Sequence, residues 1–178
     1  MPEPLSDRDE RYVRDLARRG FRYALALCHD AGAAEDLLQE GWMRLLRAGS
    51  PVEPGPLFLT IRRVFIDERR RANVAPFTLW DDSAIERIAG ADPGREMVLA
   101  TTDQIEAALG VLRPDEREAV YLQCVEGYTT AEIAKLTGRA RGSVLSLIFR
   151  AKHKLAAACV AEQQLAAARH GEPREAAQ

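Results

Sequence analysis

"TTAEIAKLTGRARGSVLSLIFRAKHKL", residues 129–155, decides the fold of this chain. Thr129 and Glu132 have the spacing of a capping box, which satisfies the first backbone N–H groups of a helix. Gly138 is the residue type that most often ends a helix in a left-handed conformation. A second helix begins at or near Ser143, and its apolar stripe consists of Val144, Ile148, Ala151 and Leu155. A short helix, a tight turn and a second helix are typical of a helix-turn-helix unit.

The second helix of this unit carries several basic residues and no acidic one. Because such a helix enters the DNA major groove, its composition favours DNA contact over a plain three-helix bundle with a solvated basic face. Leu145, Leu147 and Phe149 nevertheless lie where polar groups normally face the groove. An apolar side chain can contact a thymine methyl group, whereas an exposed apolar patch can bind a protein. Both interpretations agree with the sequence.

Helical periodicity continues outward from this unit to most of the chain. Pro114 fits the first turn of a helix that runs to about Val125, because proline lacks only an N–H that has no partner there. Nearer the N-terminus, Ser6 and Asp9 suit the start of a first helix, and "HDAGAAED" at 29–36 interrupts it and starts a second. A third helix follows the prolines and glycines of 48–56. No segment alternates like a strand, so the sequence predicts an all-α protein.

The charges divide the chain into two helical domains. The formal net charge is only -2, but basic residues concentrate at 62–71 and 139–154, with an acidic stretch between them. We expect one helical domain over 1–75, a flexible acidic linker over 76–102, the helix-turn-helix domain over 103–160 and a tail over 161–178. The tail is expected to extend the last helix until it frays at "HGEP", residues 170–173. In the free protein, the acids of the linker, among them Asp81, Asp82 and Glu86, are expected to lie against one of the basic domains or to keep both domains off nonspecific DNA.

Composition excludes several classes of protein. With 178 residues and 47% hydrophobic content, the chain can bury an ordinary core. Its three cysteines are far apart and odd in number, which argues against a disulfide framework and favours the cytoplasm. No signal pattern or apolar run of about 20 residues predicts membrane insertion. The three histidines lack metal-ligand spacing, and no phosphate loop or nucleophile motif is present, so we expect no enzyme, metal or cofactor.

Three stretches together resemble RNA polymerase sigma factors. They are "AEDLLQEGWMRLLRA" at 34–48, "LTIRRVFIDERRR" at 59–71 and residues 112–155. The first two are similar to the second conserved region of these factors and the last to the fourth, the two regions kept by the compact extracytoplasmic-function group. The resemblance implies a promoter-specificity subunit that binds core RNA polymerase and promoter DNA, with an anti-sigma protein as its regulator.

The resemblance also assigns residues to two kinds of contact. The helix that docks on core polymerase would use Asp36, Leu37, Gln39, Glu40 and Trp42. The helix that faces the minus-ten promoter element would use Arg62, Arg63, Arg70 and Arg71. By its spacing from Ile61, Phe65 is expected in the core. Without the resemblance, the acids of the first set would be interpreted as a solvated face.

The fourth region would contact the minus-thirty-five element. Phosphate contacts are expected from Arg139, Arg141 and Lys154, and base-edge contacts from Ser143, Ser146 and Arg150, with Leu145 offering an apolar contact. The chain departs from the family at Pro56, Arg63, Leu145 and Leu147, where Trp, Asn, Lys and Arg are frequent. These departures fall in the segments that the resemblance assigns to strand opening and to base contact.

Two other functions compete with promoter recognition. A sigma-like adaptor would bind an anti-sigma protein through its sigma-shaped surface without contacting DNA. The apolar residues at 145, 147 and 149 favour it, whereas the arginines of both domains oppose it. A one-component DNA-binding regulator would use only the C-terminal domain, and it leaves the helix at 34–48 unexplained.

Overall fold

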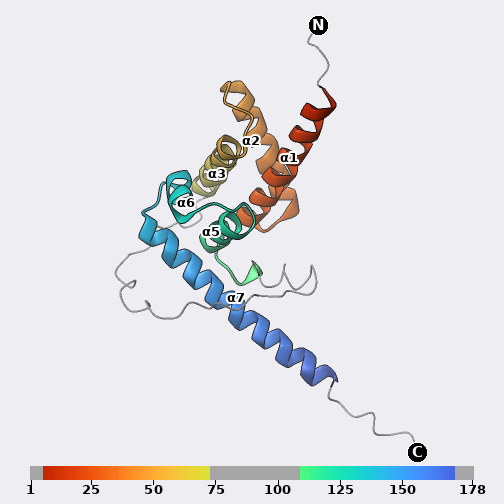
Figure 1. Cartoon of the computed structure of the whole chain (residues 1–178), viewed down its shortest axis with the longest axis vertical. Helices are drawn as coiled ribbons and strands as arrows, with labels where there is room; N and C mark the ends of the chain where they lie inside the picture. The colour runs from red at the N-terminus through yellow and green to blue at the C-terminus, as the bar shows by residue number, and fades with distance from the viewer. Residues whose placement is uncertain (1–5, 73–108, 171–178) are drawn as a thin grey trace, which may run out of the picture.

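The computed structural model describes residues 6–72 and 109–170, with side chains to residue 161. These ranges contain helices and no strand, which confirms the all-α prediction. The helices are α1 (Asp7–Cys28), α2 (Ala31–Arg47), α3 (Pro54–Arg71), α5 (Pro114–Cys124), α6 (Thr130–Thr137) and α7 (Arg141–His170). Helices α1–α3 form one unit, and α5–α7 form a second unit beside it (Figure 1). The expected acidic linker, with Asp81, Asp82 and Glu86, lies outside the described residues, and the domain boundaries stay predictions.

Local signals start and end the first three helices. The Ser6 hydroxyl accepts a hydrogen bond from the Asp9 backbone N–H at 3.3 Å, as the sequence predicts. His29 adopts a left-handed conformation with φ of 57°, and Asp30 then caps α2 through the backbone N–H of Ala33 at 2.8 Å. Helix α3 begins at Pro54, earlier than expected, because prolines suit a first turn whose N–H groups have no helical partner.

Close helix contacts in the first unit depend on two glycines. A Cβ atom on Gly20 would lie 2.7 Å from Leu38 Cδ1, and one on Gly41 would lie 2.7 Å from Ile61 Cγ1. A side chain at Gly20 would displace the end of the Leu38 side chain, and one at Gly41 would press on Ile61, whose backbone also lies within 3.6 Å. Phe65 is 5% exposed, which confirms its place in the core.

The second unit is a helix-turn-helix, as predicted. Thr129 and Glu132 form the capping box at the start of α6, and Gly138 ends that helix with φ of 69°. Helix α7 begins at Arg141, two residues before Ser143, and continues to His170, so residues 161–170 of the tail extend it as expected. Its predicted inner stripe is at most 5% exposed: Val144, Ile148, Ala151 and Leu155.

Leu147 corrects one expectation about α7. It is 4% exposed and belongs to the core, instead of occupying a position that faces a groove. The physical reason is its spacing, since it lies three residues after Val144 and four before Ala151, on the face that packs against α5 and α6. Leu145 is 50% exposed and Phe149 is partly buried.

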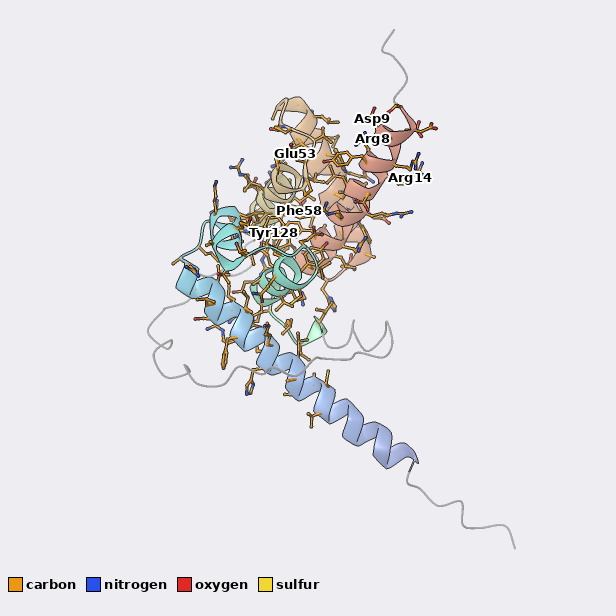
Figure 2. The ribbon with its side chains drawn as sticks, viewed as in Figure 1. Arg8, Asp9, Arg14, Glu53, Phe58 and Tyr128 are labelled. Carbon is orange, nitrogen blue, oxygen red and sulfur yellow. The ribbon has the colours of Figure 1, made fainter. Side chains whose placement is uncertain are left out.

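The two units share one apolar core. Helix α5 packs against α1, and α6 contacts α3. Tyr23 of α1 stacks on Phe58 of α3 at 4.6 Å between ring centroids and lies 6.0 Å from Tyr121 of α5. Phe58 also lies 6.4 Å from Tyr128, and Figure 2 shows these two labelled residues where the units meet. The two helical domains are thus joined face to face.

Candidate DNA and polymerase interfaces

The first turns of α7 present a largely apolar outer surface. Arg141 and Gly142 are exposed, and Leu145 lies one turn further along. Phe149 follows at the next turn, with its ring 6.4 Å from that of His153. In a helix-turn-helix, this end of the second helix is the part that meets base edges.

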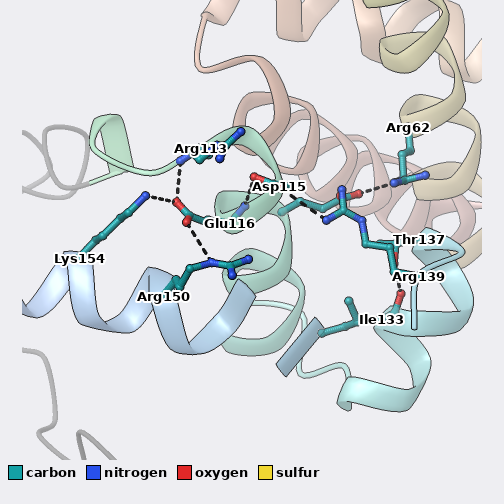
Figure 3. A network of polar contacts seen from close by, with 10 residues as sticks. Arg62, Arg113, Asp115, Glu116, Ile133, Thr137, Arg139, Arg150 and Lys154 are labelled. Carbon is teal, nitrogen blue, oxygen red and sulfur yellow. Dashed lines mark hydrogen bonds and ion pairs between the residues drawn. The ribbon is translucent and has the colours of Figure 1, made fainter. Parts of the chain in front are cut away.

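Most polar side chains predicted to contact DNA from α7 have a partner within the protein. Ser146 Oγ donates a hydrogen bond to the Gly142 carbonyl at 3.0 Å. Lys154 Nζ lies 2.7 Å from Glu116 Oε2, and Arg150 Nε lies 3.7 Å from Glu116 Oε1, as Figure 3 shows. The Glu116 side chain is 2% exposed, so these ion pairs fix α7 on α5. Arg150 and Lys154 remain 37% and 40% exposed and keep some access to phosphates.

Arg139 lies in the turn between α6 and α7 and is mostly buried. Its guanidinium is 3.7 Å from Asp115 Oδ2, and its side chain is 11% exposed. Burial lowers the pKa of Arg139, with nearby Glu118 and Asp115 opposing that shift. In this arrangement Arg139 faces α5 and not solvent (Figure 3). The fourth basic candidate of this unit, Arg141, is exposed, while Ser143 is partly buried.

Helix α3 presents the arginines of the other predicted DNA surface. Arg63, Arg70 and Arg71 are exposed. Arg62 instead points toward α5, where its Nε donates to Glu118 Oε1 at 2.8 Å and its side chain is 11% exposed. Arg62 was predicted to contact DNA, but in this arrangement its guanidinium is paired with the Glu118 carboxylate.

Glu118 is the residue that sequence analysis missed. Its side chain is 1% exposed and accepts hydrogen bonds from Arg62 and from Tyr23 Oη, the latter at 2.7 Å. Burial, and then the Glu118 carboxylate, raise the pKa of Tyr23 well above its ordinary value. Glu118 belongs to a run of four charged residues at the start of α5, Asp115–Glu118, and all four are at most 9% exposed. Several of their partners come from other helices, which the local pattern does not reveal.

A second set of polar contacts closes the same interface between the units. Arg19 Nη2 lies 2.6 Å from Glu126 Oε2, and Tyr121 Oη donates to Glu126 Oε1 at 2.8 Å. Arg117 Nε donates to the Ala26 carbonyl at 3.0 Å. The units are therefore joined by buried charge as well as by apolar packing.

The predicted polymerase-binding residues lie along α2. Asp36 and Gln39 are exposed, and Glu40 accepts a hydrogen bond from Arg44 at 2.6 Å. Arg44 also pairs with Asp67 of α3 at 3.2 Å, which fixes α2 against α3. Leu37 is 1% exposed, so it supports this surface from the core, and Trp42 is partly buried against the same core.

The described residues contain neither a cluster of metal-ligand side chains nor a membrane-spanning helix. Within 6–72 and 109–170, no three histidine, cysteine or carboxylate side chains gather as metal ligands would. In the same ranges, no helix is long and apolar enough to cross a bilayer.

Comparison with known proteins identifies both units. Residues 10–74 match the family model for sigma-70 region 2, and residues 102–155 match the model for sigma-70 region 4. The first range covers α1–α3 and the second covers α5, α6 and the first half of α7. The order of the two regions is the one that the resemblance implies.

Three curated relatives are extracytoplasmic-function (ECF) RNA polymerase sigma factors. SigE of Mycolicibacterium smegmatis is 32% identical over 80% of this chain and 58% of its own length, so the match leaves over a third of that relative uncovered. EcfG of Rhodopseudomonas palustris is 31% identical over 86% of both chains. SigL of Mycobacterium tuberculosis is 34% identical over 76% of this chain and 79% of its own.

A solved structure shares the fold. The sigma factor RpoE of Bartonella quintana, determined in complex with the anti-sigma factor NepR, aligns with a TM-score of 0.61. The alignment has 21% identity and covers 86% of this chain and 97% of that one. With both regions matched in order and relatives above 30% identity over most of their length, the chain belongs to the ECF group of sigma-70 family RNA polymerase sigma factors.

Proposed function

We propose that this protein binds core RNA polymerase and directs it to specific promoters, acting as an initiation factor and not as an enzyme. Helices α1–α3 contact the minus-ten element, and α5–α7 contact the minus-thirty-five element. The observation that carries the proposal is the helix-turn-helix of α6 and α7, whose second helix exposes an acid-free first half within a sigma family chain. The exposed Arg63, Arg70 and Arg71 supply a second basic surface on the other unit.

The α2 surface is the proposed contact with polymerase. Asp36 and Gln39 are exposed there, and Arg44 holds Glu40 beside them through an ion pair on one helix. The ion pair from Arg44 to Asp67 fixes the direction of α2, so the surface is formed before the partner arrives. An anti-sigma protein is the proposed regulator, by analogy with the RpoE structure solved with NepR.

Contact with both promoter elements requires the two units to separate. Helices α3 and α6 touch each other here. Elements about 25 base pairs apart lie about 85 Å apart at about 3.4 Å per base pair. Separation would release Arg62 from Glu118, so this predicted DNA contact would become available only in the open form, whereas Arg139 pairs with Asp115 inside the second unit.

Co-purification with core polymerase and a transcription assay test this function together. The full chain is mixed with bacterial core RNA polymerase, passed over a sizing column, and the complex is given a library of promoter fragments. Co-elution and transcripts from a defined subset of fragments are expected. A chain that co-elutes but starts no transcript, or that does not co-elute, contradicts the proposal.

The adaptor function is a second candidate, and the interface between the units favours it. Glu118 pairs with Arg62 across this interface. Within the second unit Asp115 pairs with Arg139, and Leu145 is half exposed on the surface expected to meet DNA. An adaptor would bind an anti-sigma protein and release another sigma factor from it, with no promoter-dependent transcripts of its own. The library assay separates the two functions.

A further inference from the structure

We propose that α7 recognises the minus-thirty-five element through thymine methyl groups, with Leu145 and Phe149 as the residues that set the preference. This inference rests on the proposed function, since it assigns the chemistry of one of its DNA contacts. It starts from the surface that the first turns of α7 present. Gly142, Leu145 and Phe149 lie at positions i, i+3 and i+7, which share one helix face. That face points away from the stripe that packs on α5 and α6.

Hydrogen-bonding groups on this part of α7 are largely committed to the protein. Ser146 Oγ donates to the Gly142 carbonyl at 3.0 Å, within its own helix. Lys154 and Arg150 pair with Glu116, a carboxylate that is almost fully buried on α5. These contacts keep α7 in position, and a base edge could bond to the same side chains only by replacing them. Polar recognition of bases by these three residues is therefore weakened.

In place of these polar groups, the outer surface of the first turns of α7 exposes apolar side chains. Leu145 is 50% exposed, and Phe149 is partly exposed, with its ring 6.4 Å from that of His153. In the major groove only thymine presents a methyl group, whereas the other base edges present donors and acceptors that an apolar side chain leaves unpaired. Leu145 and Phe149 therefore favour thymine and oppose the other three bases at the positions they meet.

Helix geometry fixes how far apart these positions are. Four residues along a helix span about 6 Å, and successive base pairs are about 3.4 Å apart. The two side chains thus meet methyl groups about two base pairs apart when α7 lies along the groove. Arg141, exposed at the start of the helix, is left to contact a phosphate.

Deoxyuridine substitution tests the inference, because uracil lacks only the methyl group of thymine. Duplexes selected by the full chain with core polymerase are remade with deoxyuridine at one thymine at a time. We expect about fourfold weaker binding for each methyl lost at two positions of the minus-thirty-five element. Deoxyuridine outside the element is the matched control and leaves affinity unchanged. Leu145→Ala abolishes the difference in affinity between the thymine and the uracil duplex at one position, and Phe149→Ala abolishes it at the other. Arg141→Ala weakens binding to the thymine and the uracil duplex equally.

The outcomes separate this inference from the proposed function. If selected promoters are bound and transcribed but uracil at every position of the element is neutral, thymine recognition is wrong and promoter recognition stands. If the thymine preference persists in Leu145→Ala and Phe149→Ala, other residues provide it and the assignment is wrong. If no promoter is bound with core polymerase, both the inference and the proposed function fail.

Discussion

Glu118 joins the two units, and its replacement by alanine gives the sharpest stability prediction. The carboxylate is 1% exposed and accepts hydrogen bonds of 2.7 Å from Tyr23 and 2.8 Å from Arg62. The variant leaves a buried hydroxyl without its acceptor and a guanidinium, 11% exposed, without its carboxylate. Breaking a buried pair by removing one partner costs about 3–5 kcal/mol. Because the acceptor comes from α5 and the donors from α1 and α3, the loss falls on the contact between the units.

Urea unfolding of the full chain at neutral pH measures this effect. Tyr23→Phe removes one hydrogen bond to a charged group and keeps the ion pair, so its expected loss is smaller, about 1.5–3 kcal/mol. In a double-mutant cycle the two changes share one interaction, and the combined loss should fall short of the sum by at least about 1 kcal/mol. Glu40→Ala is the matched control, since it removes a carboxylate from a pair near the surface and should cost about 0.5 kcal/mol or less. A Glu118→Ala variant as stable as Glu40→Ala would refute the reasoning.

Three further predictions concern other parts of the molecule. Gln39→Ala should weaken co-elution with core polymerase while changing the free energy of unfolding by less than about 0.5 kcal/mol, and unchanged co-elution would remove this residue from the polymerase surface. Gly41→Val should lower the free energy of unfolding in urea by about 1–3 kcal/mol, because the valine side chain would meet Ile61. An unchanged free energy of unfolding would show that α2 and α3 can move apart without cost. The free energy of unfolding should fall as pH rises above 10, because Tyr23 ionises there in the unfolded chain, while its raised pKa keeps it neutral in the folded protein. In urea titrations at alkaline pH, Tyr23→Phe should make this loss of stability with pH less steep. An equally steep loss in the variant would contradict the burial argument.

Features set by neighbouring residues could be predicted from the sequence. The capping box of Thr129 and Glu132, the start of α5 at Pro114 and the end of α6 at Gly138 all depend on contacts within one turn, and all are confirmed. The inner stripe of α7 was predicted for the same reason. Leu147 was misplaced because α7 packs on two helices at once, which widens its buried face beyond the predicted stripe.

Features set by distant residues could not be predicted. Tyr23 and Glu118 are 95 residues apart in sequence, and nothing near either one indicates that they meet. A carboxylate early in a helix is favourable in water as well as in a core, so the sequence of α5 does not distinguish the two environments. The same limit applied to Arg62 and Arg139, whose charge favoured DNA contact. The position of Arg62 depends on how the two units pack, and that of Arg139 on how the turn after α6 packs on α5.

The length of α7 has a spatial consequence. Its 30 residues span about 45 Å as one rod, and the ion pair from Lys154 to Glu116 lies near the middle. The half from Arg141 to Leu155 is held on α5 and α6 by its buried stripe, and beyond Lys154 the helix continues for about 24 Å to His170. A partner that grips the His170 end would therefore sit far from the turn that begins at Arg141, on the same continuous helix, and could bind without covering it.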